Sequence, residues 1–163
     1  MLSIVKSFPD YQFVIAGAPS QDAEFYNSFI ANESVHFVAN CTYDLLSISH
    51  AAMVTSGTAT LETALFKVPE VVCYKTSWIS YQIGKRLVKL KFISLVNLIL
   101  NKEVVTELIQ GEFNSERLTK ELTAILQGPV REAQFEAYYD LEVKLGGSGA
   151  SLKVAELIYN SLN

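Results

Sequence analysis

The chain has 163 residues, of which half are apolar and 18% are charged. This length fits one domain with a sizeable core, and the small share of charged residues leaves apolar surface for a partner, a lipid or another domain. Thirteen basic and seventeen acidic residues give a formal charge of −4, which provides no bulk attraction to phosphate backbones. Nucleic acid is therefore not expected as a partner.

The apolar segments and the cysteines indicate the cellular compartment. No segment approaches the ~18 to 20 unbroken apolar residues of a membrane-spanning helix, and residues 1–8 are too short for a secretory signal. Cys41 and Cys73 form no C-x-x-C pair and lie in or beside apolar stretches, which favours reduced, buried thiols. We therefore expect a cytoplasmic protein that does not span a membrane.

Short apolar, β-branched runs alternate with amphipathic segments along the first two thirds of the chain. This alternation is typical of βα units wound into a parallel sheet flanked by helices, an α/β fold. The predicted strands are Tyr11–Ala16, Ser34–Val38, Ala51–Thr55, Glu70–Tyr74 and Phe92–Leu95, and the helices between them are Gln21–Ala31, Tyr43–Ser49, Thr58–Lys67 and Ser77–Leu90.

The beginning of the chain departs from this pattern. Leu2–Ser7 resembles the end of a helix, closed by Pro9-Asp10, whereas a doubly wound domain normally opens with a strand. We therefore expect the opening strand to be missing, and the alternative is a protein that simply begins with a short helix. Because that strand is central in such a sheet, we expect Tyr11–Ala16 and Ala51–Thr55 to pair directly, or two copies to associate through the gap.

The last third of the chain is predicted to be helical. Gly111, Gly128-Pro129 and Gly146-Gly147 separate the predicted helices, which are Lys102–Gln110, Ser115–Gln127, Val130–Leu145 and Ala150–Leu162. We expect residues 1–110 to form the α/β domain and residues 111–163 to pack on it as C-terminal helices, ending in a helical tail.

A helix that begins directly after a predicted buried strand is the strongest candidate for a binding site. Ala51–Thr55 is followed by Ser56-Gly57-Thr58, and Gly57 permits a tight turn and the close approach of a ligand. The amides of such a helix start attract anions, and a diphosphate suits them. Glu62 lies one turn further on the same helix face, within reach of a ribose diol. The alternative is an ordinary capped helix with Glu62 as a solvated surface acid.

Other sites have weaker support in the sequence. The chain contains no G-x-G-x-x-G, no Walker lysine pattern and no G-x-S-x-G, which disfavours nicotinamide, ATP and serine-hydrolase chemistry. His36 and His50 stand alone in apolar surroundings without metal-ligand spacing, so packing or capping roles are expected and no metal is implied.

The run from Ser56 to Leu65, followed by Val68-Pro69 and the strand to Tyr74, resembles the donor-site segment of lipid-A-disaccharide synthases. The resemblance extends over nearly the whole chain. It continues in Lys85-Arg86-Leu87-Val88-Lys89, Ile93–Ile99, Glu103-Val104-Val105 and Glu107-Leu108-Ile109-Gln110. It implies the Rossmann-like, C-terminal half of a GT-B glycosyltransferase. Val96 and Thr106 stand where the family usually has proline.

By this resemblance, the family transfers 2,3-diacylglucosamine from UDP to 2,3-diacylglucosamine 1-phosphate with inversion, without a metal or a further cofactor. Ser56, Gly57 and Thr58 would hold the diphosphate and Glu62 the ribose, while Tyr81 and Asn97 would line the active site. The acceptor-binding domain with the catalytic base is not expected in this chain. We therefore assign no catalytic residue here and expect the chain alone to be inactive.

The segment around the predicted Ser77–Leu90 helix is basic and apolar. Trp78, Lys85, Arg86 and Lys89 are candidates for contact with the inner-membrane surface, which would make the protein a peripheral one, and a solvated basic edge is the alternative. A homo-oligomer is a further candidate assembly. Two other functions stay open: a non-catalytic UDP-sugar-binding module and a domain similar to UDP-N-acetylglucosamine epimerase.

Overall fold

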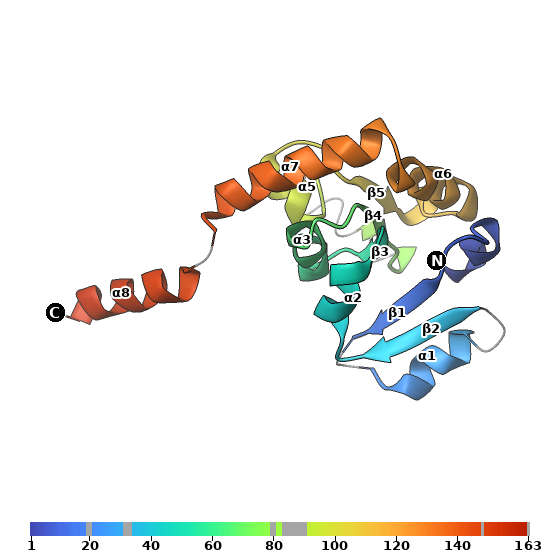
Figure 1. Ribbon diagram of the computed structural model, residues 1–163, viewed down its shortest axis with the longest axis horizontal. Coiled ribbons are helices and arrows are strands. Elements are labelled where there is room, and N and C mark those ends of the chain that lie inside the picture. Colours follow the sequence, from blue (N-terminus) through green and yellow to red (C-terminus); the bar gives the residue numbers. More distant parts are fainter. Residues whose placement is uncertain (19–20, 31–33, 79–80, 83–90, 148, 163) are drawn as a thin grey trace.

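The computed structural model describes residues 1–18, 21–30, 34–78, 81–82, 91–147 and 149–162. In this part of the chain, parallel strands form two sheets that are flanked by helices (Figure 1). One sheet pairs β1 (Phe13–Gly17) with β2 (Val35–Ala39), and the other has the order β3 (Ala52–Thr55), β4 (Glu70–Tyr74), β5 (Thr106–Ile109). The helices include η1 (Leu2–Ser7), α1 (Ala23–Ile30), α2 (Thr42–Ile48), α3 (Thr58–Leu65), α5 (Leu95–Leu100), η2 (Gln110–Glu112), α6 (Ser115–Leu126), α7 (Pro129–Leu145) and α8 (Ala150–Leu162). This is the α/β, Rossmann-like arrangement expected from the sequence.

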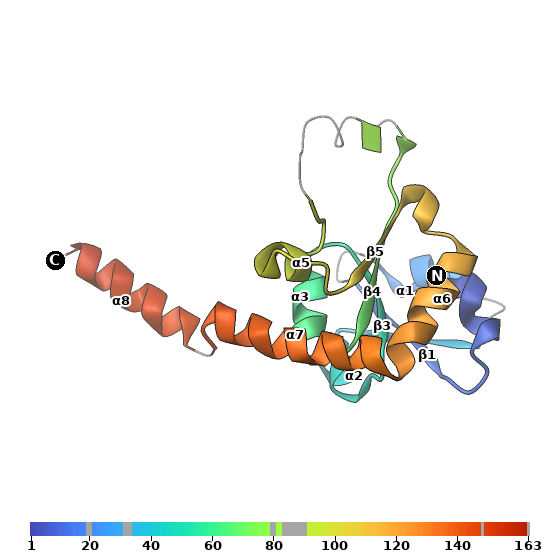
Figure 2. The same cartoon turned by 90° about the horizontal axis from the view of Figure 1, so that it is seen from above.

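Strand β4 lies between two hydrophobic cores. Val71 and Cys73 face a cluster from η1, β5 and α6, whereas Val72 faces a cluster built mainly by α3, α5 and α7. Figure 2 shows these two groups of helices on opposite sides of β3–β4–β5. Val71 and Val72 are completely buried, and each such side chain contributes roughly 1.5–3 kcal/mol. Burial also raises the pKa of the Cys73 thiol to about 12.

Cys41 does not share this environment. It was expected to be buried, but it is exposed. Cys41 stands at the N-cap position of α2, where the chain enters the helix from the surface, and its apolar neighbours in sequence do not enclose it. The prediction of a buried thiol is therefore right for Cys73 and wrong for Cys41.

The two sheets are joined through side chains. Among the described residues β1 pairs only with β2, and β3 pairs only with β4, so the predicted direct pairing of β1 with β3 is wrong. Phe8, which follows η1, instead lies against Phe13 of β1 with 6.2 Å between ring centroids, and it belongs to the same buried cluster as Val71. The aromatic contact thus connects the β1–β2 sheet to the core around β4.

The last strand lies later in the chain than the sequence pattern predicts. Phe92–Leu95 was expected to be a strand, but Ser94 caps α5 by accepting the amide of Asn97 at 3.3 Å. Thr106–Ile109 was expected to be helical, and it pairs with β4 instead, with Leu108 opposite Cys73. Val105 and Leu108 have helical spacing in the sequence, but they are buried in different cores, whereas residues three apart on a helix share a face.

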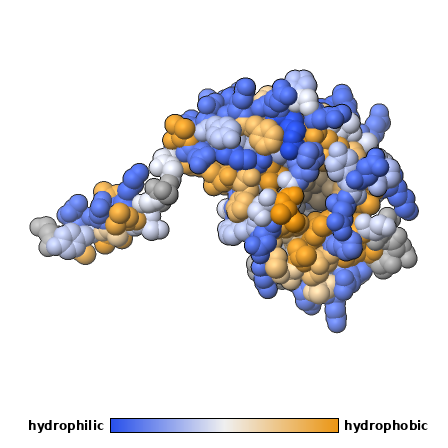
Figure 3. Space-filling view, in the orientation of Figure 1, coloured by the Kyte–Doolittle hydropathy of each residue, from blue (hydrophilic) through white to orange (hydrophobic). Residues whose placement is uncertain are grey.

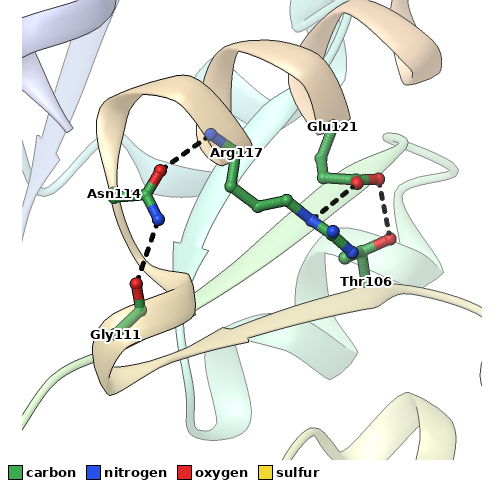
Figure 4. Close-up of polar contacts among 5 residues, drawn as sticks. All are labelled: Thr106, Gly111, Asn114, Arg117 and Glu121. Carbon is green, nitrogen blue, oxygen red and sulfur yellow. Dashed lines mark hydrogen bonds and ion pairs between the residues drawn. The ribbon is translucent and has the colours of Figure 1, made fainter.

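Helix α6 is fastened to β5 and to its own first turn by polar contacts (Figure 4). Asn114 caps the helix by accepting the amide of Arg117 at 2.9 Å, and its side-chain amide donates to the carbonyl of Gly111. Glu121 accepts from Thr106 at 3.3 Å and pairs with Arg117 at 3.0 Å. These contacts fix the outer edge of β5.

Helices α6 and α7 pack against the rest of the fold, whereas α8 projects away from it (Figures 1 and 2). Apolar side chains of α8 lie on its surface (Figure 3), among them Leu152, Leu157 and Leu162, which are all well over half exposed. In the described part of the chain, no helix is both long enough and apolar enough to cross a membrane.

The first residue of β4, Glu70, is an acid buried at the contact with α7. Gln134 of α7 accepts the Glu70 amide at 2.9 Å and donates to the Glu70 carbonyl at 3.2 Å, while the Tyr138 hydroxyl donates to the same Gln134 oxygen. These bonds use the backbone of Glu70 but not its carboxyl group, which is fully buried and has no hydrogen-bond partner among the described residues. Desolvation therefore raises the pKa of Glu70 well above its usual range.

The raised pKa of Glu70 predicts a loss of stability as pH rises. Below the unfolded-state pKa of about 4.3, the Glu70 carboxyl is protonated in both the folded and the unfolded protein. Above that pH the carboxyl ionises in the unfolded chain but stays protonated in the folded one. The free energy of unfolding therefore falls with rising pH until the pH passes the folded-state pKa of Glu70. Replacing Glu70 with Gln removes this dependence. Between pH 5 and 8, denaturant titrations should show the stability of Glu70→Gln rising relative to wild type by roughly 1–4 kcal/mol.

Glu136→Gln provides the control, because Glu136 is an exposed acid on the same helix α7. Its stability should follow the wild-type pH dependence. A constant difference between wild type and Glu70→Gln across this pH range would contradict the burial of a protonated Glu70.

Candidate functional site

The candidate site lies at the carboxyl end of β3, where the chain turns into α3. Gly57 is the N-cap residue, with φ of +152°, and a Cβ built on it would meet nothing within 4 Å. Glycine is therefore favoured here by backbone conformation and not by crowding. No side chain caps this helix start, and Gly57 and Thr58 are exposed. The first amides of a helix have no acceptor within it, so the turn presents them at the surface.

The hydroxyl groups of this turn have different environments. Ser56 is half-buried, and its Oγ donates to the carbonyl of Ile93 at 3.1 Å. Thr60 is buried and donates back to the carbonyl of Gly57 at 2.8 Å. Thr58 is exposed, and its hydroxyl makes no hydrogen bond among the described residues, in contrast to that of Ser56. The Ser56 hydrogen already has an acceptor, and this residue therefore links the turn to the segment around Ile93.

Glu62 lies one turn after Thr58 on α3. Its side chain is half-buried and, among the described residues, makes no hydrogen bond or ion pair. The other end of the helix is fixed, because Lys67 donates to the Tyr138 carbonyl at 3.0 Å and pairs with Glu142 at 2.7 Å. Packing on α7 thus holds α3 in place while the Glu62 carboxylate keeps its acceptor capacity.

Asn97, predicted to line the active site, is completely buried within α5. Its side-chain oxygen accepts the amides of Val104 and Val105 at 2.7 and 3.0 Å. Its side-chain nitrogen donates to the Val105 carbonyl and to Glu107 at 2.8 and 2.9 Å. With all four bonds made, Asn97 holds the connection from α5 to β5 and does not present its amide to a ligand.

Glu107 was not among the predicted site residues, yet it binds one of them, Asn97, and the segment that precedes α5. Its carboxylate accepts the backbone amides of Ile93 and Ser94, each at 2.9 Å, and also the side chain of Asn97. The sequence carried one signal for this role, because an acidic residue in an otherwise apolar strand needs donors when it is partly buried. Which donors it meets is decided by the strand pairing of β5.

The remaining predicted site residues are described only in part. Tyr81 is half-buried and donates its amide to the Ser77 carbonyl at 3.0 Å, and Trp78 is 72% exposed. Lys85, Arg86 and Lys89 lie outside the described residues, as does most of the predicted helix Ser77–Leu90.

The two histidines lie in different surroundings. The His50 ring lies 2.8 Å from the carbonyl of Leu126 and close to Arg131, whereas His36 is exposed on β2. Within the described ranges, no three His, Cys, Asp or Glu side chains are grouped as a metal site would require.

Comparison with known proteins places this arrangement in a family. A family model described as lipid-A-disaccharide synthetase matches residues 2–160. The chain is 40% identical over 152 residues to a lipid-A-disaccharide synthase of Anaeromyxobacter dehalogenans, covering 91% of this chain and 40% of the relative. It is 42% identical over 148 residues to that of Syntrophus aciditrophicus (88% and 39%) and 34% identical over 158 residues to that of Geobacter sulfurreducens (95% and 41%).

The chain spans about 40% of the length of these curated relatives. The family model covers almost every residue, from η1 into α8, and the matched range contains the residues of the turn at Gly57 and Glu107. The chain belongs to the lipid-A-disaccharide synthetase family.

Proposed function

We propose that the chain forms the donor-binding part of an inverting glycosyltransferase. In this proposal the enzyme transfers 2,3-diacylglucosamine from UDP to 2,3-diacylglucosamine 1-phosphate and so forms the lipid A disaccharide. The observation that carries it is the uncapped, exposed start of α3 with Glu62 one turn further along, in a chain of this family. The names of the curated relatives support the reaction.

Each residue of the turn has a separate role in this proposal. The exposed amides at Gly57 and Thr58, with the Thr58 hydroxyl, bind the diphosphate, and the helix dipole favours its negative charge. Ser56 supports the turn through Ile93, and Glu62 accepts hydrogen bonds from the ribose hydroxyls. During transfer, the same amides stabilise the charge that develops on the departing diphosphate. The chain contributes no catalytic base, and we propose no metal or cofactor besides the UDP-sugar.

The acylated substrates lead us to propose a cytoplasmic protein that acts peripherally at the inner membrane, where donor and acylated glucosamine phosphate acceptor reside. Two exposed features support surface contact: the Trp78 side chain and the apolar side chains of α8. The same apolar side chains of α8 also support self-association, in which a second copy of the chain would cover them.

Glu62 and UDP provide the first test of the proposal. Titration calorimetry on the chain should show UDP binding that Glu62→Ala weakens by about 1–3 kcal/mol, because hydrogen bonds from the ribose to a carboxylate are lost. Glu103→Ala is the matched control, since Glu103 is an exposed acid after α5 and far along the chain from the turn. Equal UDP affinity in wild type and Glu62→Ala would remove Glu62 from the site.

Gly57 allows a second, independent test of the same turn. Gly57→Ala forces a side chain into a φ of +152°, whereas Gly111→Ala adds a methyl group in equally open space without a positive φ. The first variant should bind UDP roughly 5- to 150-fold more weakly, because strain of roughly 1–3 kcal/mol displaces the amides. The Gly111→Ala variant should bind like wild type. Similar affinities in both variants would show that the conformation at Gly57 does not matter to binding.

The transfer reaction itself can be tested in a chimera. This chain would replace the matching segment of the Anaeromyxobacter dehalogenans relative, to which it is 40% identical over 152 residues. The chimera should form disaccharide from the UDP-sugar donor and the monosaccharide acceptor, and the chain alone should form none above background. A folded chimera that binds UDP without transfer would favour a non-catalytic binding module, and one that epimerises UDP-N-acetylglucosamine would favour the epimerase alternative.

A further inference from the structure

Two side chains, one within β5 and one directly after it, hold backbone groups at the two ends of the connection from β4 to α5. Glu107, within β5, holds Ile93 and Ser94, which precede α5. Gln110, directly after β5, holds Thr76, which follows β4. Neither residue was predicted as a site residue from the sequence. Together they fix the points where the connection leaves the carboxyl edge of the sheet and where it returns.

The bonds of Glu107 are of the strong, charge-assisted kind. One carboxylate oxygen accepts the Ile93 amide at 2.9 Å, and the other accepts the Ser94 amide at 2.9 Å and the Ser94 hydroxyl at 2.8 Å. The second oxygen also accepts the Asn97 side chain at 2.9 Å. A carboxylate has about four acceptor positions, and all four bonds here come from one short stretch of chain.

The Gln110 side chain makes a pair of hydrogen bonds with the backbone of Thr76. Its side-chain oxygen accepts the Thr76 amide at 3.0 Å, and its nitrogen donates to the Thr76 carbonyl at 3.1 Å. The register between β4 and β5 ends with Tyr74 opposite Ile109. The Gln110 side chain therefore continues the ladder beyond the last paired residues, where its own backbone, at φ of +53°, has turned away into η2.

The returning end of the connection reaches the candidate site. Ile93, held by Glu107 through its amide, accepts the Ser56 hydroxyl through its carbonyl at 3.1 Å. Ser56 directly precedes the glycine at the start of α3, and its own amide donates to the Cys73 carbonyl on β4. Displacement of Ile93 would therefore move the group that holds the Ser56 side chain, and with it the residue before the glycine of the turn.

We propose that Glu107 and Gln110 are positioning residues of the donor site. They hold Thr76 and Ile93-Ser94 against the carboxyl edge of β3–β4–β5, and Glu107 acts through Ile93 and Ser56 on the turn that binds the diphosphate. Neither residue touches the ligand. This inference rests on the proposed function for its effect on UDP, while the two attachments themselves do not depend on it.

The test combines amide hydrogen exchange, measured by NMR, with UDP titration on the same variants. Glu107→Gln replaces one acceptor oxygen with a donor that faces amides, and Gln110→Asn keeps an amide that tolerates positive φ but is one methylene too short for Thr76. Exchange at Ile93 and Ser94 should rise by about 10- to 100-fold in Glu107→Gln, the factor expected for losing a charged hydrogen bond, and exchange at Thr76 should rise in Gln110→Asn. Val72, in the core of β4, should exchange as in wild type.

The UDP titration separates positioning from folding. In Glu107→Gln the Kd for UDP should rise by about 5- to 10-fold while the binding stoichiometry stays at the wild-type value, because every molecule keeps a displaced but intact site. A purely structural defect would instead lower the stoichiometry and leave the Kd unchanged. Glu103→Gln and Gln127→Asn are the matched controls, since both residues are exposed and lie outside this network.

Three results would count against the inference. Unchanged exchange at Ile93 and Ser94 in Glu107→Gln would overturn the attachment by Glu107, and unchanged exchange at Thr76 in Gln110→Asn would overturn that by Gln110. Faster exchange with unchanged UDP affinity would overturn the link to the donor site. If wild type itself binds no UDP, the proposed function fails in this chain and the link to it fails as well, while the exchange rates still decide the attachments.

Discussion

The burial of β4 on both faces, complete from Glu70 to Cys73, is the constraint on which the rest of the structure depends. Its side chains alternate between two cores, one closed by η1 and α6 and the other by α3, α5 and α7. Since a strand covered on both faces cannot shift by one residue without exchanging its two cores, the register with β3 and β5 follows from this packing. The register in turn brings Ser56, Thr76 and Gln110 to one edge of the sheet.

Polar groups from several elements gather at that edge. β3, β4 and β5 all end there, so a helix start, a carboxylate and a side-chain amide from distant parts of the sequence become neighbours. This is the position at which open parallel sheets bind their ligands. The Glu107 carboxylate links these groups. It binds the amides before α5 to β5, and Ile93, one of the residues it binds, accepts the hydroxyl of Ser56 in the turn before α3.

The opposite end of β4 holds a different kind of acid. Glu70 is buried like Val72 but, unlike Glu107, has no donor for its carboxyl group among the described residues. Gln134 satisfies the backbone of Glu70 and so fastens α7 to the sheet beside an uncompensated acid. The contrast shows how the same residue type stabilises one end of the sheet through its charge and makes the other end sensitive to pH.

Local patterns were sufficient to predict the elements whose signals are strong and uninterrupted. Glu70–Tyr74 and Ala150–Leu162 were predicted with the bounds that the structure has, and the helix start at Thr58 was recognised from Ser56-Gly57-Thr58 after a predicted buried strand. Phe92–Leu95 and Lys102–Gln110 were assigned the wrong structure. Short apolar runs suit a strand or a helix equally well, and the partner that decides between them, β4, is more than thirty residues away from β5.

The sequence by itself determined the fold class, the family resemblance and the residues Ser56, Gly57, Thr58 and Glu62 as a candidate site, because strand, turn and helix are contiguous there. The tertiary structure alone decided that Asn97 is buried support and that Glu107 joins α5 to the sheet. It also decided that β1 and β3 lie in separate sheets. Hydrogen bonds between residues far apart in sequence leave no periodic signal, since each depends on which strands become neighbours.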